Sequence, residues 1–470
     1  GKDFVPIEAK YLKKGDFIPI PLKLNFPALE YPLPDVEENE IVIITDKGRQ
    51  LIKEKVKEFG LTYYELGRKL GKYPSFINNM VNNKKFISHK SKKLTKSLLS
   101  MFKIDERLHD QDYFKIPITI PKSVTVPLCE FLGVYWGDGN YDNTNYIMHI
   151  SDKDVGNLNY YNDLIKTLFN ANTEIKQYGN KYKLYLKQTF PLFNLMKKLG
   201  LTTSNTRKLP KLVYYLSNDE LSAFIRGYFD AESCVRTSNT GGSITLETSC
   251  EEVTHQLRLL LLRFGVLCKI GQRKRFEKRT TRGEYIIYSL TINDRKSLLN
   301  YKEKIGYNHP QKIEKLEFAI SKFKKGHLKY YRYPSTIVQK VMELLKIKSY
   351  DITKKLNKRI NEIMFGKYNI PLKLLKLLVP YFNEKFEEFK LNGNNIEEIE
   401  PYINFLNQLL SKENEFGFDE IVEIELIENG DELVFYDLTL DKNHNFIAEG
   451  IFTHNSISSS SFATLEFAKT

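Results

Sequence analysis

An internal repeat in the middle of this chain limits the folds that it can adopt. The first copy begins near residue 127 with the apolar stretch PLCEFLGVYWGDGNY, and the second begins near residue 219 with DELSAFIRGYFDAESC. Each opening stretch is followed by strand patterning, an apolar helix, a β-hairpin and a further helix. The sequence therefore predicts two αββαββα units, packed about a pseudo-twofold axis.

Both opening helices carry small residues in the middle and an acid at the end. Gly133 and Gly137 precede Asp138, and a glycine and an alanine take the same places before Glu232. Residues four apart share a helix face, so small side chains there let two helices approach backbone to backbone. We therefore expect the two acids to lie together at the ends of a crossed helix pair. For either helix alone, an acid that merely caps a helix is the simpler interpretation.

Two facing carboxylates repel one another unless a divalent cation lies between them. Asp138 and Glu232 thus predict a magnesium-type site, for Mg²⁺ or Mn²⁺, with oxygen ligands from both copies. Such a site can activate water and stabilise the leaving oxygen at a phosphodiester. The formal net charge of +13 favours a polyanionic partner and so agrees with a nucleic acid substrate.

The two opening stretches also carry a family resemblance. FLGVYWGDG and IRGYFDAES resemble the two motif copies of the LAGLIDADG homing endonucleases, over about residues 127–315. The resemblance implies site-specific, metal-dependent cutting of double-stranded DNA, with Asp138 and Glu232 as catalytic metal ligands. Two positions depart from the family pattern, since Trp136 replaces the first motif acid and Ser233 replaces the last glycine.

The same resemblance implies a lysine near each acid. Lys208 in TRKLPKL and Lys312 in EKIGYNHPQK occupy these places, where a cation can polarise water or offset charge at the phosphate. A solvated lysine is the alternative at both positions. The hairpins of the two copies would form a saddle on DNA, with the basic stretch 269–285 contacting phosphates and base edges. A DNA-binding protein of the same fold that does not cut is the alternative function.

Two helical segments flank the repeat and resemble each other. LTYYELGRKLG in the first and KSYDITKKLN in the second follow an apolar helix and precede a helix with Asn and basic residues. This pattern predicts two small modules of helix-turn-helix type, which would extend the contact with DNA. Two ordinary helical bundles are the alternative.

The C-terminal part of the chain has a second family resemblance. LVFYDLTLDKNHNFIAEGIFTHN, residues 433–455, resembles the C-terminal splicing motifs of inteins. The resemblance implies a horseshoe-shaped, all-β Hint splicing domain, of which the strand-like residues at the start of the chain would form another part. The endonuclease would be inserted within that domain. An isolated splicing module with a decayed insert is a third interpretation.

The intein resemblance implies an ordered set of reactive residues. Asn455 would attack its own peptide carbonyl, close a succinimide ring and release Ser456. His454 would polarise that carbonyl or protonate the leaving group, as imidazole can near neutral pH. His444 would assist as a proton carrier, and Asp437 would help set up the nucleophile and the branched intermediate. The Ser456 hydroxyl would attack the upstream flank and take it as an ester.

Inteins also carry an N-terminal Cys or Ser and a Thr-x-x-His motif, and neither precedes FVPIEAKYLKKGDFIPIP in this sequence. We therefore expect that this polypeptide does not splice by itself. The missing part is either a truncation or an N-terminal intein half on a separate chain.

The predicted fold class is multidomain α+β. Its segments are 1–35, part of the splicing domain; 36–110, a helical DNA-binding module; 111–330, the LAGLIDADG endonuclease; 331–415, a second helical module; 416–455, the C-terminal splicing segment; and 456–470, the C-extein. The cysteines show no CxxC spacing and there is no apolar run of the roughly 18 residues that would suggest a membrane span. We therefore predict reduced thiols and a monomer in the cytoplasm, with double-stranded DNA and the host protein as partners and no membrane.

Overall fold

The structure is a computed structural model. It describes residues 11–36, 43–82, 97–103 without 99, 114–115, 118–142, 147–186 without 172, 190–201, 208–277, 283–323, 332–333, 335–356, 370–425 without 414, 445–448 and 450–454. The chain divides into two compact units. One unit contains Gly1–Phe26, Cys234–Lys304 and Glu314–Thr470, and the other contains Pro27–Ser233 and Ile305–Ile313.

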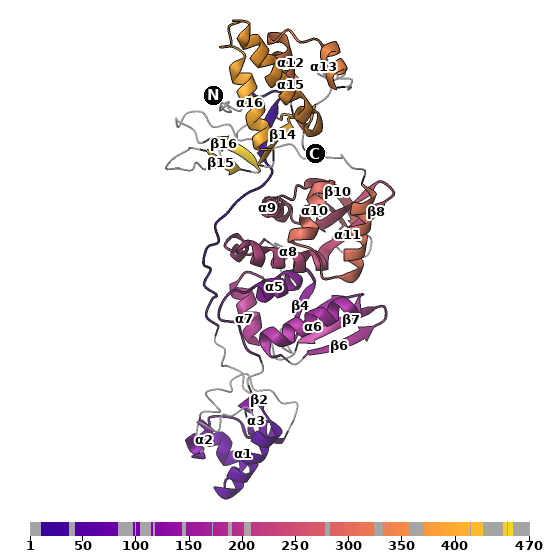
Figure 1. Cartoon of the computed structure of the whole chain (residues 1–470). Coiled ribbons are helices and arrows are strands. Elements are labelled where there is room, and N and C mark those ends of the chain that lie inside the picture. The colour runs from indigo at the N-terminus through magenta and orange to yellow at the C-terminus, as the bar shows by residue number, and fades with distance from the viewer. Residues whose placement is uncertain are drawn as a thin grey trace. The chain divides into compact units, whose positions relative to one another are not determined.

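The first repeat copy has the predicted αββαββα order (Figure 1). Its elements are α5 (Val126–Asp138), β4 (Gly139–Asp142), β5 (Ile147–Asp152), α6 (Val155–Phe169), β6 (Thr173–Tyr178), β7 (Lys181–Leu186) and α7 (Phe190–Lys198). The strands form one antiparallel sheet in the order β4-β5-β7-β6.

The second copy repeats this order. Its elements are α8 (Asn218–Glu232), β8 (Ser233–Ser238), β9 (Gly241–Thr248), α9 (Glu251–Leu262), β10 (Lys269–Glu277), β11 (Gly283–Ile292) and α10 (Arg295–Lys304), followed by α11 (Pro310–Lys322). Its sheet has the order β10-β11-β9-β8. The prediction of a repeated αββαββα unit is confirmed by the order of elements in both copies.

The starts of the two opening helices are fixed by side-chain caps. The Thr125 hydroxyl accepts a hydrogen bond from the backbone N–H of Leu128 at the start of α5. At the start of α8, Ser217 and Glu220 form a reciprocal capping box. Such caps stabilise a helix end by about 1 kcal/mol. They set where each helix begins, whereas each helix ends where the backbone becomes extended, at Gly139 after α5 and at Ser233 after α8.

The first helical module has a hydrophobic core of its own. It contains β2 (Ile43–Ile44), α1 (Asp46–Glu58), α2 (Tyr63–Lys69), α3 (Pro74–Asn82) and β3 (Phe114–Lys115), with β2 and β3 paired. Ile52, Leu66, Ile77 and Met80 are buried in that core. The stretch predicted as short helices is therefore helical where the structure describes it.

In the described part of the second helical module, two helices lie between a pair of strands and two more follow that pair. The module contains β12 (Arg332–Tyr333), α12 (Ser335–Leu344), α13 (Ser349–Leu356), β13 (Ile370–Pro371), α15 (Leu372–Leu391) and α16 (Glu400–Ser411), and β12 pairs with β13. A short 3-10 helix, η3 (Lys211–Tyr214), lies outside this module, shortly before α8. None of the helices among the described residues is long and apolar enough to cross a membrane.

Two further strand pairs lie outside the repeat, and one of them joins strands from opposite ends of the sequence. β1 (Phe17–Pro21) runs antiparallel to β14 (Phe416–Glu420), and β15 (Asn445–Ala448) forms a hairpin with β16 (Ile451–His454). Leu22 after β1, Leu262 at the end of α9 and Phe416 in β14 belong to one hydrophobic core, together with buried residues of α12, α13, α15 and α16. These strands are therefore part of the same core as the second repeat copy.

Candidate active site

The two opening helices, α5 and α8, touch through their backbones. A Cβ added to Gly133 of α5 would overlap the Phe224 carbonyl and lie 2.9 Å from the Tyr228 nitrogen. A Cβ on Gly227 of α8 would likewise overlap the Glu130 carbonyl of α5. The predicted close crossing of the two glycine-containing helices is therefore confirmed.

A third small residue brings the two acids to the same end of this helix pair. A Cβ on Gly137 would lie 2.5 Å from the Ala231 Cβ and 3.1 Å from the Glu232 Cγ. The side chain of Glu232 thus uses the space that Gly137 leaves free, next to Asp138. The structure brings the two predicted carboxylates together.

The surroundings of Asp138 disfavour its charge. Burial raises the pKa of this carboxyl to about 7, and the negative charges of Glu232 and then Asp152 act in the same direction. Lys312 and Lys181 act against this shift. A half-buried carboxylate and an exposed one that repel each other are a donor set that fits a hard divalent cation. Among the described residues there is no group of three or more His, Cys, Asp or Glu side chains suited to a metal.

The raised pKa of Asp138 predicts a stability effect in the absence of metal. A carboxyl that binds its proton more tightly in the folded chain makes the free energy of unfolding fall as pH rises from the ordinary pKa of 3.8 to about 7. Asp138→Asn removes this fall and is expected to stabilise the chain by about 2–4 kcal/mol at pH 7.5. Chemical denaturation in EDTA at pH 7.5 and pH 4 measures this. Equal stability of the two proteins at pH 7.5 would contradict it, while near equality is expected at pH 4.

Lys312 lies at the C-terminal end of α8. Its Nζ donates hydrogen bonds to the carbonyl oxygens of Phe229, at 2.9 Å, and Asp230, at 2.6 Å. These are carbonyls of the last helical turn, where a cation is favoured by the helix dipole. Lys312 therefore both caps the helix that ends in Glu232 and supplies positive charge near Asp138.

The second predicted lysine is placed differently. Lys208 is exposed and lies just before η3. The largest charge effects on Asp138 come from Glu232, Asp152, Lys312 and Lys181, and Lys208 is not among them. Lys181 is the first residue of β7 and was not singled out by sequence. The charge of Lys181 affects the pKa of Asp138 only because of how the hairpin folds against α5, and no local sequence pattern predicts that.

The two departures from the family motif both have structural partners. The ring of Trp136 packs against that of Tyr228 of α8, with centroids 4.4 Å apart. The buried Ser233 hydroxyl donates to the Phe229 carbonyl at 2.7 Å and lies 2.8 Å from the Tyr307 hydroxyl. Both substitutions are thus accommodated by packing and hydrogen bonding at the helix pair.

Aromatic and basic side chains alternate on the first sheet. The rings of His149 and Tyr185 lie 5.6 Å apart, and those of Tyr178 and Tyr185 lie 6.3 Å apart. The ammonium groups of Lys176 and Lys183 lie 6.0 Å and 5.6 Å from the Tyr185 and Tyr178 rings. Such a surface suits stacking and phosphate contacts. The sequence predicts that the hairpins of both copies face DNA, and it singles out the basic stretch 269–285 of the second copy.

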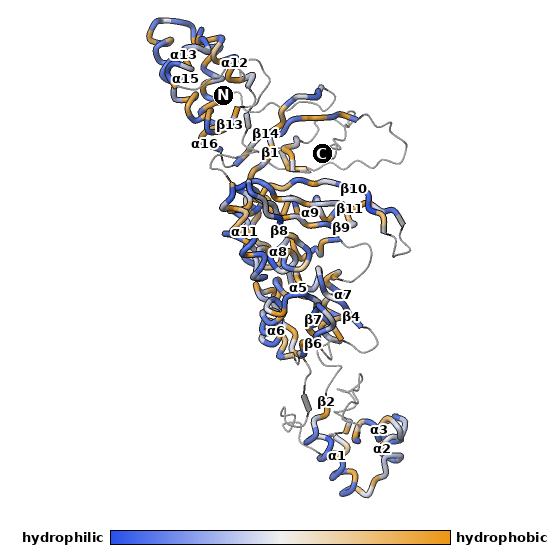
Figure 2. The backbone as a smooth tube through the Cα atoms, turned by 90° about the vertical axis from the view of Figure 1, so that its right-hand side faces the viewer, coloured by the Kyte–Doolittle hydropathy of each residue, from blue (hydrophilic) through white to orange (hydrophobic). Residues whose placement is uncertain are grey.

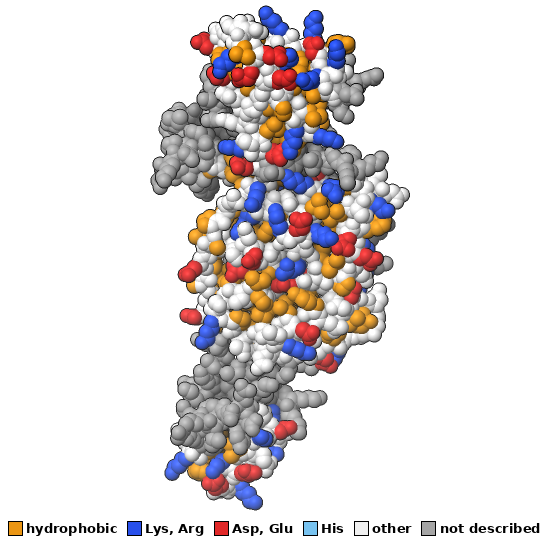
Figure 3. Space-filling model, in the orientation of Figure 1, with side chains coloured by type: hydrophobic (Ala, Val, Ile, Leu, Met, Phe, Trp, Pro, Cys, Tyr) orange, Lys and Arg blue, Asp and Glu red, His pale blue; other side chains and the backbone are white. Residues whose placement is uncertain are grey.

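The hairpin of the second copy is basic, but acids partly balance it. Arg273 is paired with Glu247 at 2.8 Å, and Lys274 is paired with Glu284 at 3.4 Å. The outer end of this hairpin is hydrophilic (Figure 2). Basic and acidic side chains are also interspersed on the face shown in Figure 3. The second hairpin can therefore offer phosphate contacts once these ion pairs exchange partners.

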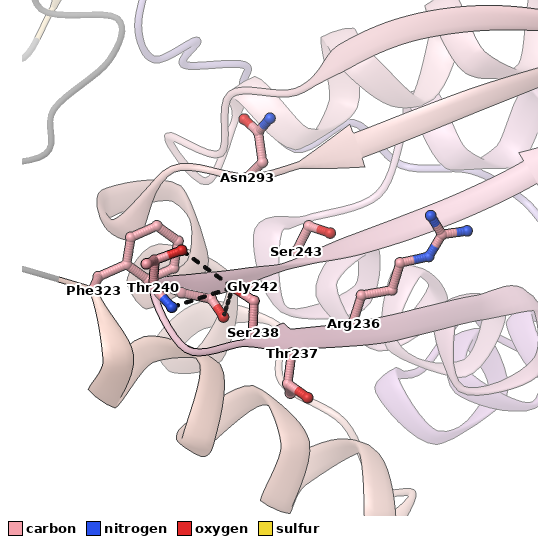
Figure 4. Close-up of a pocket in the computed structure, with 9 residues that line it drawn as sticks. Arg236, Thr237, Ser238, Thr240, Gly242, Ser243, Asn293 and Phe323 are labelled. Carbon is pink, nitrogen blue, oxygen red and sulfur yellow. Dashed lines mark hydrogen bonds between the residues drawn. The ribbon is translucent and has the colours of Figure 1, made fainter.

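A polar depression of about 330 Å³ lies at the tip of the β8–β9 hairpin (Figure 4). Ser238, Thr240, Asn293 and Phe323 contribute to its lining. None of the predicted site residues lines it. The depression is therefore lined by other residues than the paired carboxylates Asp138 and Glu232.

Most of the predicted splicing residues cannot be placed. Asp437, His444, Asn455 and Ser456 lie outside the described residues. His454 is the last residue of β16, and its backbone pairs with Asn445 of β15.

The two helical modules share a turn. In the first, Gly60 has a positive φ of 60° and the Leu61 N–H donates to the Val56 carbonyl. In the second, Lys346 has a φ of 55° and the Ile347 N–H donates to the Met342 carbonyl.

The following helices, α2 and α13, also begin alike. The Thr62 N–H donates to Glu65, and the Lys348 N–H donates to Asp351. The resemblance between the two segments thus extends from sequence to hydrogen bonds.

Comparison with known proteins gives a family match for part of the chain. Residues 219–306 match the model of the LAGLIDADG-like domain. Curated relatives include glutamine–fructose-6-phosphate aminotransferase of Methanocaldococcus jannaschii, 26% identical over 95% of this chain and 38% of its own length. The probable translation initiation factor IF-2 of the same organism is 26% identical over 96% of this chain and 39% of its length. The chain thus spans less than two fifths of these relatives.

Similar solved structures include mesophilic variants of the homing endonuclease I-DmoI, with 17% identity, a TM-score of 0.30, and coverage of 41% of this chain and 98% of that chain. I-DmoI in complex with DNA and Mn has 15% identity, a TM-score of 0.27, and coverage of 39% and 98%. On the family match, the chain carries a LAGLIDADG-like domain within a mixed α/β structure.

Proposed function

We propose that this chain is a site-specific DNA endonuclease that depends on a divalent cation. The observation that carries the proposal is the meeting of Asp138 and Glu232 at the ends of α5 and α8, where Gly137 makes room for the Glu232 side chain. Solved structures of I-DmoI contain DNA with Mn or Ca, which agrees with such a site. Mg²⁺ or Mn²⁺ is the proposed cofactor, and double-stranded DNA the proposed substrate.

The residues of the site would divide the work of phosphodiester hydrolysis. A bound cation supplies positive charge at the phosphate and lowers the pKa of water. Asp138 and Glu232 would hold it, and Asp138 must be ionised to do so. The ammonium of Lys312, and that of Lys181 from the hairpin, would offset negative charge that develops at the phosphate. Lys208 keeps the same proposed role, on the motif resemblance alone.

The test uses the host DNA on the two sides of the proposed insertion, with the codons from Ser456 onward as the downstream side, joined to rebuild an uninterrupted site. Incubation of that duplex with the full chain and Mg²⁺ should give double-strand cuts at one position, and EDTA should prevent them. Binding without cuts, measured by gel shift in Mg²⁺, would overturn the endonuclease and favour the DNA-binding alternative. Binding is expected to weaken steeply with added salt, because phosphate contacts release counterions.

We further propose that the chain is an intein in which this endonuclease interrupts a Hint splicing domain. The relatives that match about 95% of the chain are an aminotransferase and an initiation factor, whose names have no function in common. An element inserted into different hosts would give this pattern. The pairing of β1 with β14 agrees, because it joins strands from both sides of the inserted segment.

In this proposal, cleavage occurs between Asn455 and Ser456. Asn455 cyclises, His454 and His444 assist proton transfer, Asp437 helps set up the branched intermediate, and Ser456 is the attacking hydroxyl. We expect slow release of the peptide 456–470 from the purified chain, measured by mass spectrometry over days at neutral pH. Asn455→Ala should abolish the release. If the peptide is still released from that variant, Asn cyclisation is not the mechanism.

The helical modules at 36–110 and 331–415 are proposed to extend the DNA contact. Their matching turns and helix starts support a common role. Residues 1–35 and 416–455 would belong to the splicing domain, 111–330 to the endonuclease, and 456–470 to the host protein.

A further inference from the structure

A buried carboxylate close to Glu232 has a set of partners that the proposed chemistry does not use. Asp230 is 2% exposed and lies in the last turn of α8. Its oxygens accept hydrogen bonds from the backbone N–H groups of Asn308, at 3.1 Å, and His309, at 3.2 Å. They also accept one from the Tyr161 hydroxyl at 2.8 Å. Asp230 therefore holds the segment that leads into α11.

That segment is fixed to α5 as well. The Asn308 side-chain amide donates to Glu130 of α5. Arg226 of α8 pairs with Glu130 at 3.0 Å and donates to the Ile305 carbonyl at 2.9 Å. The stretch Ile305–Ile313 is thus attached to both helices of the catalytic pair, although it follows them by many residues in the sequence.

The same segment carries Lys312. Two residues separate it from His309, and its Nζ reaches the carbonyls of Phe229 and Asp230. The side chain of Asp230 therefore binds the backbone of this segment, and the backbone carbonyl of Asp230 accepts a hydrogen bond from Lys312 of the same segment. Any shift of the segment would move the ammonium away from the end of α8, and so away from Asp138.

This arrangement occurs on one helix only. The corresponding motif position of α5 is Trp136, whose ring packs against Tyr228. A tryptophan cannot accept the hydrogen bonds that Asp230 accepts. The two halves of the site are therefore built differently, and only α8 uses a motif carboxylate to anchor the segment with its lysine.

We propose that Asp230 is a positioning residue for Lys312. It fixes the stretch Ile305–Ile313 so that the ammonium lies at the end of α8 beside the two metal-binding acids. This inference rests on the proposed endonuclease function. Three donors point at the Asp230 carboxylate, and an ionised carboxylate can accept from all of them. Asp230→Asn keeps the shape but puts an N–H₂ group where an acceptor is needed.

The direct test is the single-turnover cleavage rate of the full chain on the rebuilt duplex in Mg²⁺, with the chain in excess. Asp230→Asn is expected to lower that rate about 10- to 100-fold, the effect of a small displacement of a catalytic group. Its Kd for DNA should stay within about threefold. The matched control is Asp219→Asn, the same change at an exposed position in the first turn of α8, which should cut at the wild-type rate.

A double-mutant cycle separates positioning from general stabilisation. If Asp230 acts through Lys312, adding Asp230→Asn to Lys312→Met should slow cleavage no further than Lys312→Met alone. Wild-type cleavage by Asp230→Asn, or full additivity of the two losses, would overturn the proposal.

Hydrogen exchange supplies a readout that needs no DNA. The backbone amides of Asn308 and His309 should lose protection in Asp230→Asn and keep it in Asp219→Asn, because only the former replaces the charged carboxylate that accepts from them by a neutral amide, which is a weaker acceptor. Unchanged protection would refute the anchoring of the segment. A wild-type chain that cuts no DNA would refute the endonuclease instead, so the two failures can be told apart.

Discussion

Asp138→Asn and Glu232→Gln are each expected to lower the rate of DNA cleavage by about a thousandfold, the scale of losing one strong electrostatic stabiliser of a transition state. Each change removes one of the two carboxylates that would hold the cation. Binding of duplex DNA should stay within about threefold, since each change also removes a negative charge that faces phosphate. Single-turnover kinetics and gel shifts in Mg²⁺ measure the two quantities separately.

Asp163→Asn is the matched control for these acids. Asp163 is an exposed carboxylate on α6 of the same repeat copy, so its loss should leave cleavage unchanged. Cleavage at the wild-type rate by Asp138→Asn would show that the paired acids are not the catalytic centre. Loss of cleavage together with loss of folded structure would not count as support, and circular dichroism of each variant checks for that.

Gly133→Val is expected to have the largest effect on stability. A Cβ at this position overlaps the Phe224 carbonyl, and a backbone carbonyl cannot rotate away as a side chain can. The helices must separate, and the buried contacts between them are lost. We expect a loss of at least about 3 kcal/mol in the free energy of unfolding, seen as a lower midpoint of urea denaturation. Gly227→Val should behave in the same way, since it meets the Glu130 carbonyl.

Gly156→Ala provides the comparison. Gly156 lies at the start of α6, and an added Cβ meets only the Asp154 side-chain oxygen, at 3.0 Å. This change should lower the midpoint far less than Gly133→Val, because only a side-chain oxygen, that of the α6 cap Asp154, has to shift. A midpoint for Gly133→Val equal to that of Gly156→Ala would mean that the two helices do not cross as closely as described.

The repeat and its helices could be predicted from the sequence because their signals are local. The apolar helix predicted after the strand pattern of the first copy is α6, Val155–Phe169. The small residues before Asp138 and Glu232 predicted the crossing, because a glycine on a helix face has few other uses in an apolar helix. The same glycines also predicted that Asp138 and Glu232 lie together.

The contacts that complete the site could not be predicted in this way. Lys181, Asp152 and Asn308 reach the helix pair only through the folding of hairpins and loops. Asp230 was passed over because an acid near a helix end has many ordinary uses, and its value depends on donors far away in sequence. Lys208 matched a motif position, but motif spacing does not determine where a long exposed side chain points.

The core shared by β1, β14, α9, α12, α13, α15 and α16 has a consequence for how such a gene can change. Leu262 comes from the repeat, whereas Leu22 and Phe416 come from the paired strands on either side of it. A deletion that removed the repeat would leave these strands without part of their core. We therefore expect inactivating point mutations in the nuclease site to be tolerated far better than loss of the whole segment, so a defunct nuclease would persist as scaffold.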